Sequence, residues 1–481
     1  MAEPSTGTPA GAAALDTPTR RIADYAAGVR YEALSAATVR AAVRHLIDSV
    51  ACALGALDSR PAIVARRIAG TATVPGGASV FGLPQPTTPE YAAFANTAMV
   101  RFLDYNDTGN GGHPSDMIGA IWALAEPRRA SGRDVILAMH AAYETYAAVR
   151  RGGLHGNVLR SRHVDQIYAI FGGVVGAGVM LGLDAQRMAN AVALAVTPNI
   201  PLRVARTGVI SDWKGCATAH CAMASVFAAR LAEQGLTGPA RPIEGLGGFR
   251  AMLRIDPLDF DGIGQPRAGM SAIESTGLKH YPVEYNAQGP VQSVLSLRDR
   301  FRLDEVERLT VSLHWGGWHA IGGGAGDRDE KWNPVTRETA DHSMAYAIAA
   351  AMIDGDLTVD SFRDERLVDP RLRALMQKIV VQEDPELTRE HAGELPRWPS
   401  RVDIDLLGGR RISHKAELPK GHPLNPLSDA ELEAKFWRMA ERALPRAEAR
   451  RLLDTLWSLG QLADFSTLAE QFRACGAGGR G

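Results

Sequence analysis

The sequence predicts a mostly α protein, with a large all-helical domain plus a smaller α+β lid domain inserted before the C-terminal helices. The chain has 481 residues, several times the usual size of one hydrophobic core, so at least two packed units are expected. Its 46% hydrophobic content with only 6% aromatic residues suits closely packed, alanine-rich helices. The period-2 alternation of strands begins only beyond Pro266.

The large domain is expected to begin with residues 16–265, where apolar residues repeat at helical spacing. The predicted helices cover residues 89–104, 115–125, 133–149, 166–181, 185–196 and 216–233. Residues 419–474 complete this domain, because Ser428 and Glu431 form a capping-box pattern ahead of another helical repeat. Residues 1–15 and 475–481 are expected to be flexible ends.

The lid domain is expected over residues 266–418. Residues 306–315 and 401–406 alternate between apolar and polar side chains, which predicts two half-buried strands. Gly408 and Gly409 provide a hairpin turn toward a third strand at 411–413. Helices over 288–300 and 339–353 are expected to cover this sheet, and the cleft between two such domains is a common ligand site.

Bulk composition excludes several classes of partner. The 53 basic and 54 acidic residues give a net charge of -1 without long like-charge runs, which argues against nucleic acid or a membrane surface. Four scattered cysteines fit a reducing cytoplasm rather than a disulfide framework or an iron-sulfur cluster. The longest uncharged apolar run, 168–183, is shorter than the roughly 20 residues of a membrane span.

The segment 102–116, FLDYNDTGNGGHPSD, is the most informative in the chain. Asp104, Asp107 and Thr108 share a face if the preceding helix continues that far. Pro114 and Ser115 place His113 beside the start of the next helix, where free N–H groups attract carboxylates. Two helix ends rich in capping residues are the alternative, but the density of polar groups between apolar helices favours a site.

Two more clusters add cations. In the segment 203–215, Arg206 accompanies Lys214, which stands at a helix start where a cation needs a neighbouring anion, such as a substrate carboxylate. A solvated loop lysine is the alternative. In the segment 277–286, Lys279, Tyr281 and Glu284 are further candidates, although any one of them could be a surface group. The segment 337–343 is explained largely by helix capping.

Other patterns do not predict a cofactor. The glycine run 172–178 lies inside an apolar helical pattern with no preceding strand, so it is not a dinucleotide loop. The histidines at 155, 163, 220 and 280 lack the helical spacing of a metal site. The sequence therefore predicts no metal and no cofactor.

Five motifs in order resemble the MmgE/PrpD family: 104–108 with 112–116, 211–215, 278–282, 340–343 and 421–426. The resemblance implies a large helical domain completed by the C-terminus, a smaller α+β lid and a homodimer. It also implies site residues at Asp104, Thr108, His113, Lys214 and Lys279. The family includes 2-methylcitrate dehydratase, cis-aconitate decarboxylase and iminodisuccinate epimerase.

Departures from the family motifs bear on the substrate. Glu284 stands where the decarboxylase branch carries a catalytic histidine, which counts against decarboxylation. The Gly112-His-Pro-Ser-Asp116 form is closer to the dehydratase branch, but the link from Thr108 to Gly112 is shorter than usual there. Asn286 stands where those dehydratases tend to carry histidine, and Val164-Asp165 replaces their usual Asp-His.

The sequence therefore predicts a metal-independent hydro-lyase that dehydrates a citrate-like polycarboxylate such as 2-methylcitrate. His113 is the candidate acid or base, because an imidazole titrates near neutral pH. Asp104 is expected to orient it, and Lys214 and Lys279 to bind carboxylates and stabilise enolate-like charge. Substrate-binding candidates are Thr108, Asp107, Arg206, Tyr281 and Glu284. An epimerase or racemase, or a decarboxylase, of a small di- or tricarboxylate is the alternative.

Overall fold

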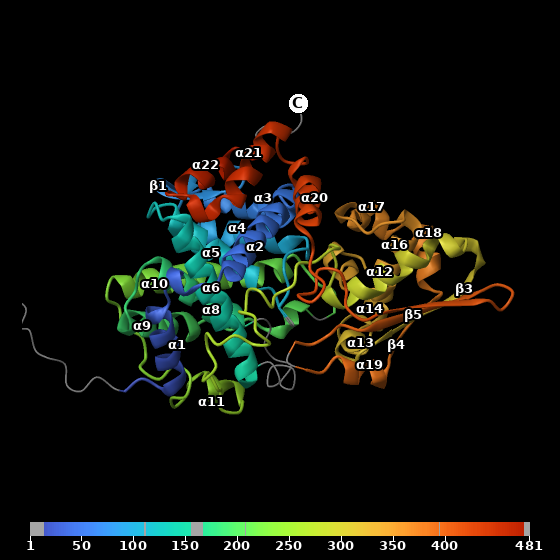
Figure 1. Ribbon diagram of the computed structural model, residues 1–481, viewed down its shortest axis with the longest axis horizontal. Coiled ribbons are helices and arrows are strands. Elements are labelled where there is room, and N and C mark those ends of the chain that lie inside the picture. Colours follow the sequence, from blue (N-terminus) through green and yellow to red (C-terminus); the bar gives the residue numbers. More distant parts are fainter. Residues whose placement is uncertain (1–13, 110–111, 155–166, 207, 394, 476–481) are drawn as a thin grey trace, which may run out of the picture.

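The chain, in a computed structural model, is described over residues 14–109, 112–154, 167–206, 208–393 and 395–475. It forms two lobes (Figure 1): a helical lobe built from both ends of the sequence and a sheet lobe built around four strands. Helices dominate the described residues, so the mostly α class predicted from the sequence is confirmed.

The helical lobe takes its helices from two separate parts of the sequence. The first part supplies α1 (Thr17–Gly28), α2 (Ala36–Gly55), α3 (Arg60–Ala69), α4 (Pro89–Phe102), α5 (Ile118–Ala125), α6 (Gly132–Val149), α8 (Tyr168–Met180), α9 (Ala185–Val196), α10 (Trp213–Glu233) and α11 (Phe249–Leu253). The second supplies α20 (Asp429–Ala440), α21 (Arg446–Trp457) and α22 (Ser466–Arg473). Because α20 and α21 both pack on α2, the end of the chain completes this lobe.

Side-chain caps fix where many of these helices begin. The side chains of Asp16, Ser35 and Thr88 each accept a hydrogen bond from a backbone N–H of the first helical turn. Ser131 begins α6 with a full capping box. Ser428 does the same for α20 through Glu431, as its sequence pattern predicts.

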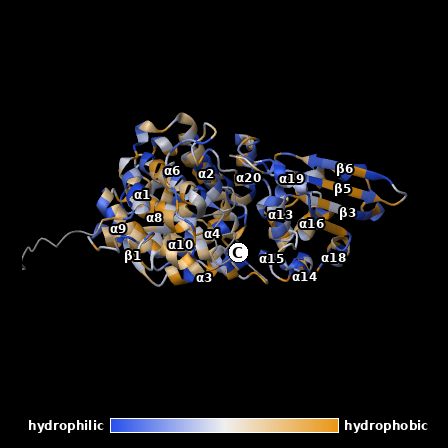
Figure 2. Ribbon diagram, turned by 90° about the horizontal axis from the view of Figure 1, so that it is seen from below, coloured by the Kyte–Doolittle hydropathy of each residue, from blue (hydrophilic) through white to orange (hydrophobic). Residues whose placement is uncertain are grey.

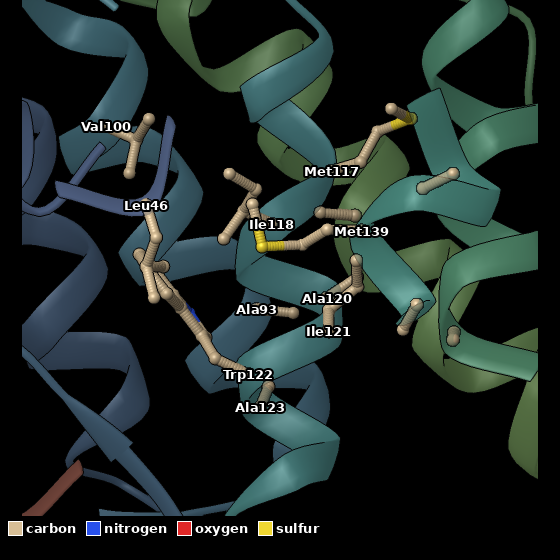
Figure 3. Packing of buried hydrophobic residues seen from close by; sticks show 14 of the residues in the cluster. Leu46, Ala93, Val100, Met117, Ile118, Ala120, Ile121, Trp122, Ala123 and Met139 are labelled. Atoms are coloured by element: carbon tan, nitrogen blue, oxygen red, sulfur yellow. The ribbon is translucent and has the colours of Figure 1, made fainter. Parts of the chain in front are cut away.

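Alanine, glycine and large apolar side chains fill the core of the helical lobe (Figure 3). Ile118, Ile121 and Trp122 of α5 point between helices and are almost fully buried. Gly172 of α8 lies so close to α6 that a Cβ there would be 2.6 Å from the carbonyl oxygen of Ala142. The glycine run at 172–178 therefore serves helix packing, which accounts for it without a nucleotide.

The sequence predicted an all-helical domain, but the helical lobe also contains two strands. β1 (Thr73–Val80) and β2 (Leu83–Thr87) form an antiparallel hairpin against α22. Gly76, Gly77, Pro84 and Pro86 interrupt the alternation by which a strand is recognised, so the pattern was missed. Several helix bounds also differ from the expected ones. The helix expected over 89–104 ends at Phe102, and the one expected from 115 starts as a 3₁₀ turn, Pro114–Met117.

The sheet lobe contains a four-stranded sheet in the order β4-β3-β5-β6. Its strands are β3 (Val306–Leu313), β4 (Ile379–Glu383), β5 (Ser400–Leu406) and β6 (Arg411–Ala416). β5 and β6 form the hairpin predicted at Gly408 and Gly409, which both have positive φ. β4 was not predicted. It pairs parallel to β3, and its apolar run is too short to identify a strand.

Helices cover the sheet, and hydrophobic and hydrophilic residues intermingle on its strands (Figure 2). α12 (Gln288–Leu297) packs on β5 and β6, and α16 (Met344–Asp354) contacts α12 and β4. The helix expected over 339–353 is broken into α15 (Arg337–Ala340) and α16, with Asp341 and His342 buried at the break, where Asp341 contacts Lys214 of the helical lobe. The other helices are α13 (Trp315–Ile321), α14 (Arg328–Trp332), α17 (Asp364–Leu367), α18 (Pro370–Met376) and α19 (Pro385–Glu390).

Each lobe has its own hydrophobic core, and the change of core falls later than the predicted boundary at 266. Ala272, Ile273 and Leu278 pack in the core of the helical lobe, whereas Tyr281 begins the core of the sheet lobe. Residues 266–280 have the composition of a loop, but they are bound to α6 of the helical lobe. Glu144 of α6 accepts a hydrogen bond of 2.6 Å from the Ala272 N–H. Cys475, placed in the flexible tail by the prediction, is buried in the helical core.

No helix among the described residues combines the length and apolar content required to cross a membrane. The apolar helix α8, for example, packs against both α6 and α10.

We expect Phe472→Ala in α22 to destabilise the helical lobe by about 3–5 kcal/mol, the usual cost of deleting a buried aromatic ring. Phe472 stacks on Phe81 with ring centroids 4.1 Å apart and is 1% exposed. Chemical denaturation of both proteins measures the loss. An unfolding free energy equal to that of the unmodified chain would show that α22 is not part of the cooperative core.

Candidate active site

The loop between α4 and α5 departs from helix at Asp104, which has a positive φ of 50°. Aspartate is among the few residues other than glycine that adopt this conformation. Asp104, Asp107 and Thr108 therefore do not share a helical face, as they would if α4 continued. The turn instead directs Asp104 toward a group of buried cations.

Asp104 is fully buried beside two positive groups, Lys279 and Arg101. Lys279 Nζ donates to its carbonyl oxygen at 2.7 Å and to its Oδ2 at 3.0 Å, and Arg101 donates to its Oδ1. Burial alone raises the pKa of this carboxyl, but the charges of Lys279 and Arg101 outweigh it and hold the pKa well below its usual value. Asp104 is a carboxylate at neutral pH.

His113 lies beside Asp104 as the residue that precedes the 3₁₀ turn. Its Nδ1 is 2.7 Å from the carbonyl oxygen of Asp107, so Nδ1–H donates there. Its Nε2 is 3.6 Å from Asp104 Oδ1. Burial, together with the charges of Arg101 and Lys279, lowers the pKa of His113 well below its usual value. The ring is therefore neutral, with an Nε2 lone pair available to accept a proton.

Asp107, predicted as a substrate-binding residue, supports the loop through hydrogen bonds within the protein. Its Oδ2 accepts from Tyr143 Oη at 2.7 Å and lies 2.9 Å from His45 Nδ1. Its Oδ1 accepts from the Ser115 N–H at 3.0 Å. Both carboxylate oxygens are thus used within the fold, and they fix the backbone that holds His113.

Lys214 is the second residue of α10, as the sequence predicts, and is 1% exposed. The solvated-loop alternative is therefore wrong. The anion it needs is provided by the protein: Asp341, at the break between α15 and α16, lies with Oδ1 2.5 Å from Lys214 Nζ. Burial lowers the pKa of Lys214, while Asp341 opposes that shift. This contact joins the helical lobe to the sheet lobe.

Asp341 also orients a second histidine. His342 Nδ1 is 2.7 Å from Asp341 Oδ1, and Arg337 Nη1 donates to Oδ2 at 3.1 Å. Burial, followed by the charge of Lys214, lowers the pKa of His342 to about 3, so this imidazole is also neutral. The sequence interpretation attributed this segment to helix capping, and only the ordered match to the family motif at 340–343 marked it.

The other predicted site residues are Arg206, Glu284, Thr108 and Tyr281, and they differ in how they relate to the buried cluster of lysines, histidines and carboxylates. Arg206, in the 3₁₀ helix Arg203–Arg206, is near enough for its charge to lower the pKa of His113. Glu284 interacts with the charges of Lys279 and Asp104, and burial raises its pKa. Thr108 pairs with Gly277 through its backbone. Tyr281 packs in the core of the sheet lobe, and the structure does not bring it into the cluster.

Lys435 of α20 holds two backbone segments of the site in place. Its Nζ donates to the carbonyl oxygens of Tyr105 at 2.6 Å and Lys279 at 3.1 Å, and pairs with Asp48 Oδ1 at 2.5 Å. One C-terminal side chain therefore ties together the two segments that carry Asp104 and Lys279. Nothing in the spacing of the sequence marks it.

Asp104, Asp341 and His342 offer three metal-ligand atoms within 4.8 Å of one another, a group that spacing along the chain could not show. Both carboxylates are already paired with ammonium groups, Lys279 for Asp104 and Lys214 for Asp341. A dication placed there would be repelled by both lysines. Among the described residues, the two lysine ammonium groups therefore provide the positive charge here, and the arrangement does not suit a metal ion.

Two buried lysines, two neutral histidines and two ionised carboxylates, where two hydrophobic cores meet, define an enzyme site suited to proton transfer. The chain belongs to the MmgE/PrpD family: the MmgE/PrpD N-terminal domain matches residues 20–260 and the C-terminal domain matches residues 281–460.

The relatives of this chain are enzymes. It is 31% identical over 467 residues to the 2-methylcitrate dehydratase of Cupriavidus necator, covering 90% of this chain and 92% of that protein. It is 28% identical over 465 residues to the 2-methylcitrate dehydratase of Salmonella typhimurium, with the same coverage. It is also 25% identical over 413 residues to human cis-aconitate decarboxylase, covering 81% of each chain.

We expect Lys214→Met to destabilise the protein by about 2–3 kcal/mol, because it leaves Asp341 buried without its ammonium partner. Arg337 and His342 still contact the Asp341 carboxylate in this variant. The loss of unfolding free energy should therefore be smaller than for a buried ion pair without other partners. Asp341→Asn in the same chain should restore part of the stability. Denaturant unfolding of both single variants and of the double variant measures this coupling, and strictly additive losses would refute it.

Proposed function

We propose that this protein is a hydro-lyase that removes water from a citrate-like polycarboxylate such as 2-methylcitrate. The observation that carries the proposal is the neutral His113, whose Nε2 faces Asp104 between buried Lys214 and Lys279. A base beside two ammonium groups suits the removal of a proton from a carbon next to a carboxylate. The 2-methylcitrate dehydratases, related over 90% of this chain, support the same reaction.

In the proposed reaction, Nε2 of His113 takes the carbon-bound proton while Lys214 and Lys279 stabilise the enolate-like charge that develops on the neighbouring carboxylate. The electron pair then forms the carbon–carbon double bond, and the carbon–oxygen bond breaks. The hydroxyl leaves as water after receiving a proton. Lys279 is our candidate donor, because burial lowers its pKa and makes its proton easier to give.

An epimerase is the second candidate, favoured by His342. A second neutral imidazole, held by Asp341 as His113 is held by Asp107, could return a proton to the opposite face of the same carbon. Glu284 could do the same. A decarboxylase is a further alternative, given the likeness to human cis-aconitate decarboxylase.

Several wider features belong to the same proposal. We expect catalysis without a metal ion, because the lysines occupy the positions of positive charge. The two separate cores support a lid formed by residues 281–418 on a helical domain that residues 419–475 complete. Cytoplasmic localisation is proposed because the four scattered cysteines fit a reducing compartment. A homodimer is proposed from the resemblance to the family.

A substrate screen in deuterated water tests the reaction class. Purified protein, with and without a chelator, is incubated with methylcitrate, citrate, cis-aconitate and iminodisuccinate, and alkene absorbance, deuterium uptake and carbon dioxide are followed. We expect alkene from methylcitrate or citrate, unchanged by the chelator. Deuterium uptake without alkene would replace the dehydratase by an epimerase, and carbon dioxide release would replace it by a decarboxylase.

We expect His113→Gln to reduce turnover by roughly 10²–10⁴-fold, the usual contribution of a general acid or base. Glutamine can still donate a hydrogen bond to the Asp107 carbonyl but cannot accept a proton at neutral pH. Turnover on the substrate found in the screen is compared with thermal unfolding of the same variant.

His140→Gln is the matched control, since His140 is a half-buried histidine whose pKa burial lowers to about 4, but it lies in a different pocket. It should leave turnover nearly unchanged. Turnover near that of the unmodified protein in a well-folded His113→Gln variant would remove His113 from the mechanism.

A further inference from the structure

A cavity lies where the end of α6 meets the sheet lobe. Its volume is about 330 Å³, and Tyr143, Tyr146 and Arg150 line it from the helical lobe. Trp398 and His422 line it from the opposite side. Lys214, Lys279 and Asp341 are not among the described residues that line it, although Thr108, a predicted substrate-binding residue, does line it.

The wall of the cavity is strongly basic. Arg150, Arg151 and Arg267 all line it, and none of its described lining residues is acidic. Burial lowers the pKa of Arg150, and no carboxylate among the described residues contributes to that pKa. A guanidinium in this position is costly unless an anion joins it.

Two polar groups on this wall are buried and lack a partner. Nε of Arg150 and the hydroxyl of Tyr146 form no hydrogen bond with any described residue, while the two residues are 8% and 2% exposed. Buried donors are rarely left unpaired in folded proteins, and such a pair at a cavity indicates a missing ligand or ordered water. Tyr146 lies in the last turn of α6 and Arg150 directly follows that helix, and both residues line the cavity.

We propose that this cavity binds a small polycarboxylate anion at a site separate from the lysine cluster. Arginine forks pair with carboxylates in two parallel hydrogen bonds, and several guanidiniums around one cavity suit a ligand with more than one carboxylate. The aromatic walls of Tyr143, Tyr146, Tyr285 and Trp398 cover its carbon chain. The volume is at the lower end of small-molecule pockets, which fits a short chain of carbon atoms.

The cavity also lies behind the loop that carries His113. Thr108, Gly109 and Pro114 of that loop form part of its wall. Tyr143, another wall residue, donates to Asp107, and a Cβ at Gly112 would lie 1.9 Å from the Tyr146 hydroxyl. A bound anion therefore contacts the support of the loop, independently of the reaction proposed for the lysine cluster.

Calorimetric titration with propane-1,2,3-tricarboxylate tests the site, because this probe lacks a hydroxyl and cannot be dehydrated. We expect two equivalents per chain in the unmodified protein. Arg150→Gln should weaken one equivalent at least tenfold and leave the other, whereas Lys214→Met should weaken only the other. Arg187→Gln, which removes an equally charged but exposed arginine on α9, is the control and should change neither.

Tyr146→Phe provides a second test if Arg150→Gln does not fold, because it removes only the unpartnered hydroxyl and should weaken the same equivalent. One equivalent that Arg150→Gln and Lys214→Met both weaken would mean a single shared site and overturn the proposal. Two equivalents that neither Arg150→Gln nor Tyr146→Phe affects would also overturn it. Orthophosphate is titrated in parallel, and binding of phosphate without the tricarboxylate would overturn the assigned ligand class.

Discussion

The buried contact between Lys214 and Asp341 sets the position of the sheet lobe on the helical lobe, and the geometry of the site depends on it. Each ion is costly to remove from water, by several kcal/mol, and is tolerated only when its partner is in place. Lys214 starts a helix of one core, while Asp341 stands at a helix break of the other. A displaced lobe would separate Lys214 from Asp341, so the pair favours this one placement of the lobes over others.

The site divides charge and proton transfer between different residue types. The lysines and Asp104 remain ionised because each lies beside an opposite charge, whereas His113 and His342 remain neutral because they are buried near cations. A neutral imidazole beside ammonium groups takes a proton only when negative charge arrives with it. An anionic substrate would bring that charge, which links the basicity of the histidines to occupancy of the site.

The sequence predicted most long helices because their periodicity and caps are local properties. It missed β1 and β2, where glycine and proline hide the strand pattern, and β4, whose pairing with β3 depends on residues about 70 positions away. Within the site, Lys214 was recognised because a cation at a helix start is unusual. Asp341 and His342 were not, because capping explains them equally well until the fold brings them to Lys214.

The role of Lys435 has a consequence for how the protein is made. Its ammonium group holds the carbonyl oxygens of Tyr105 and Lys279 and pairs with Asp48, so three segments far apart in the sequence meet at one late residue. During translation, the N-terminal helices leave the ribosome hundreds of residues before this group exists. A nascent chain can thus collapse its helical core early, while the site acquires its final shape only when α20 emerges and docks on α2.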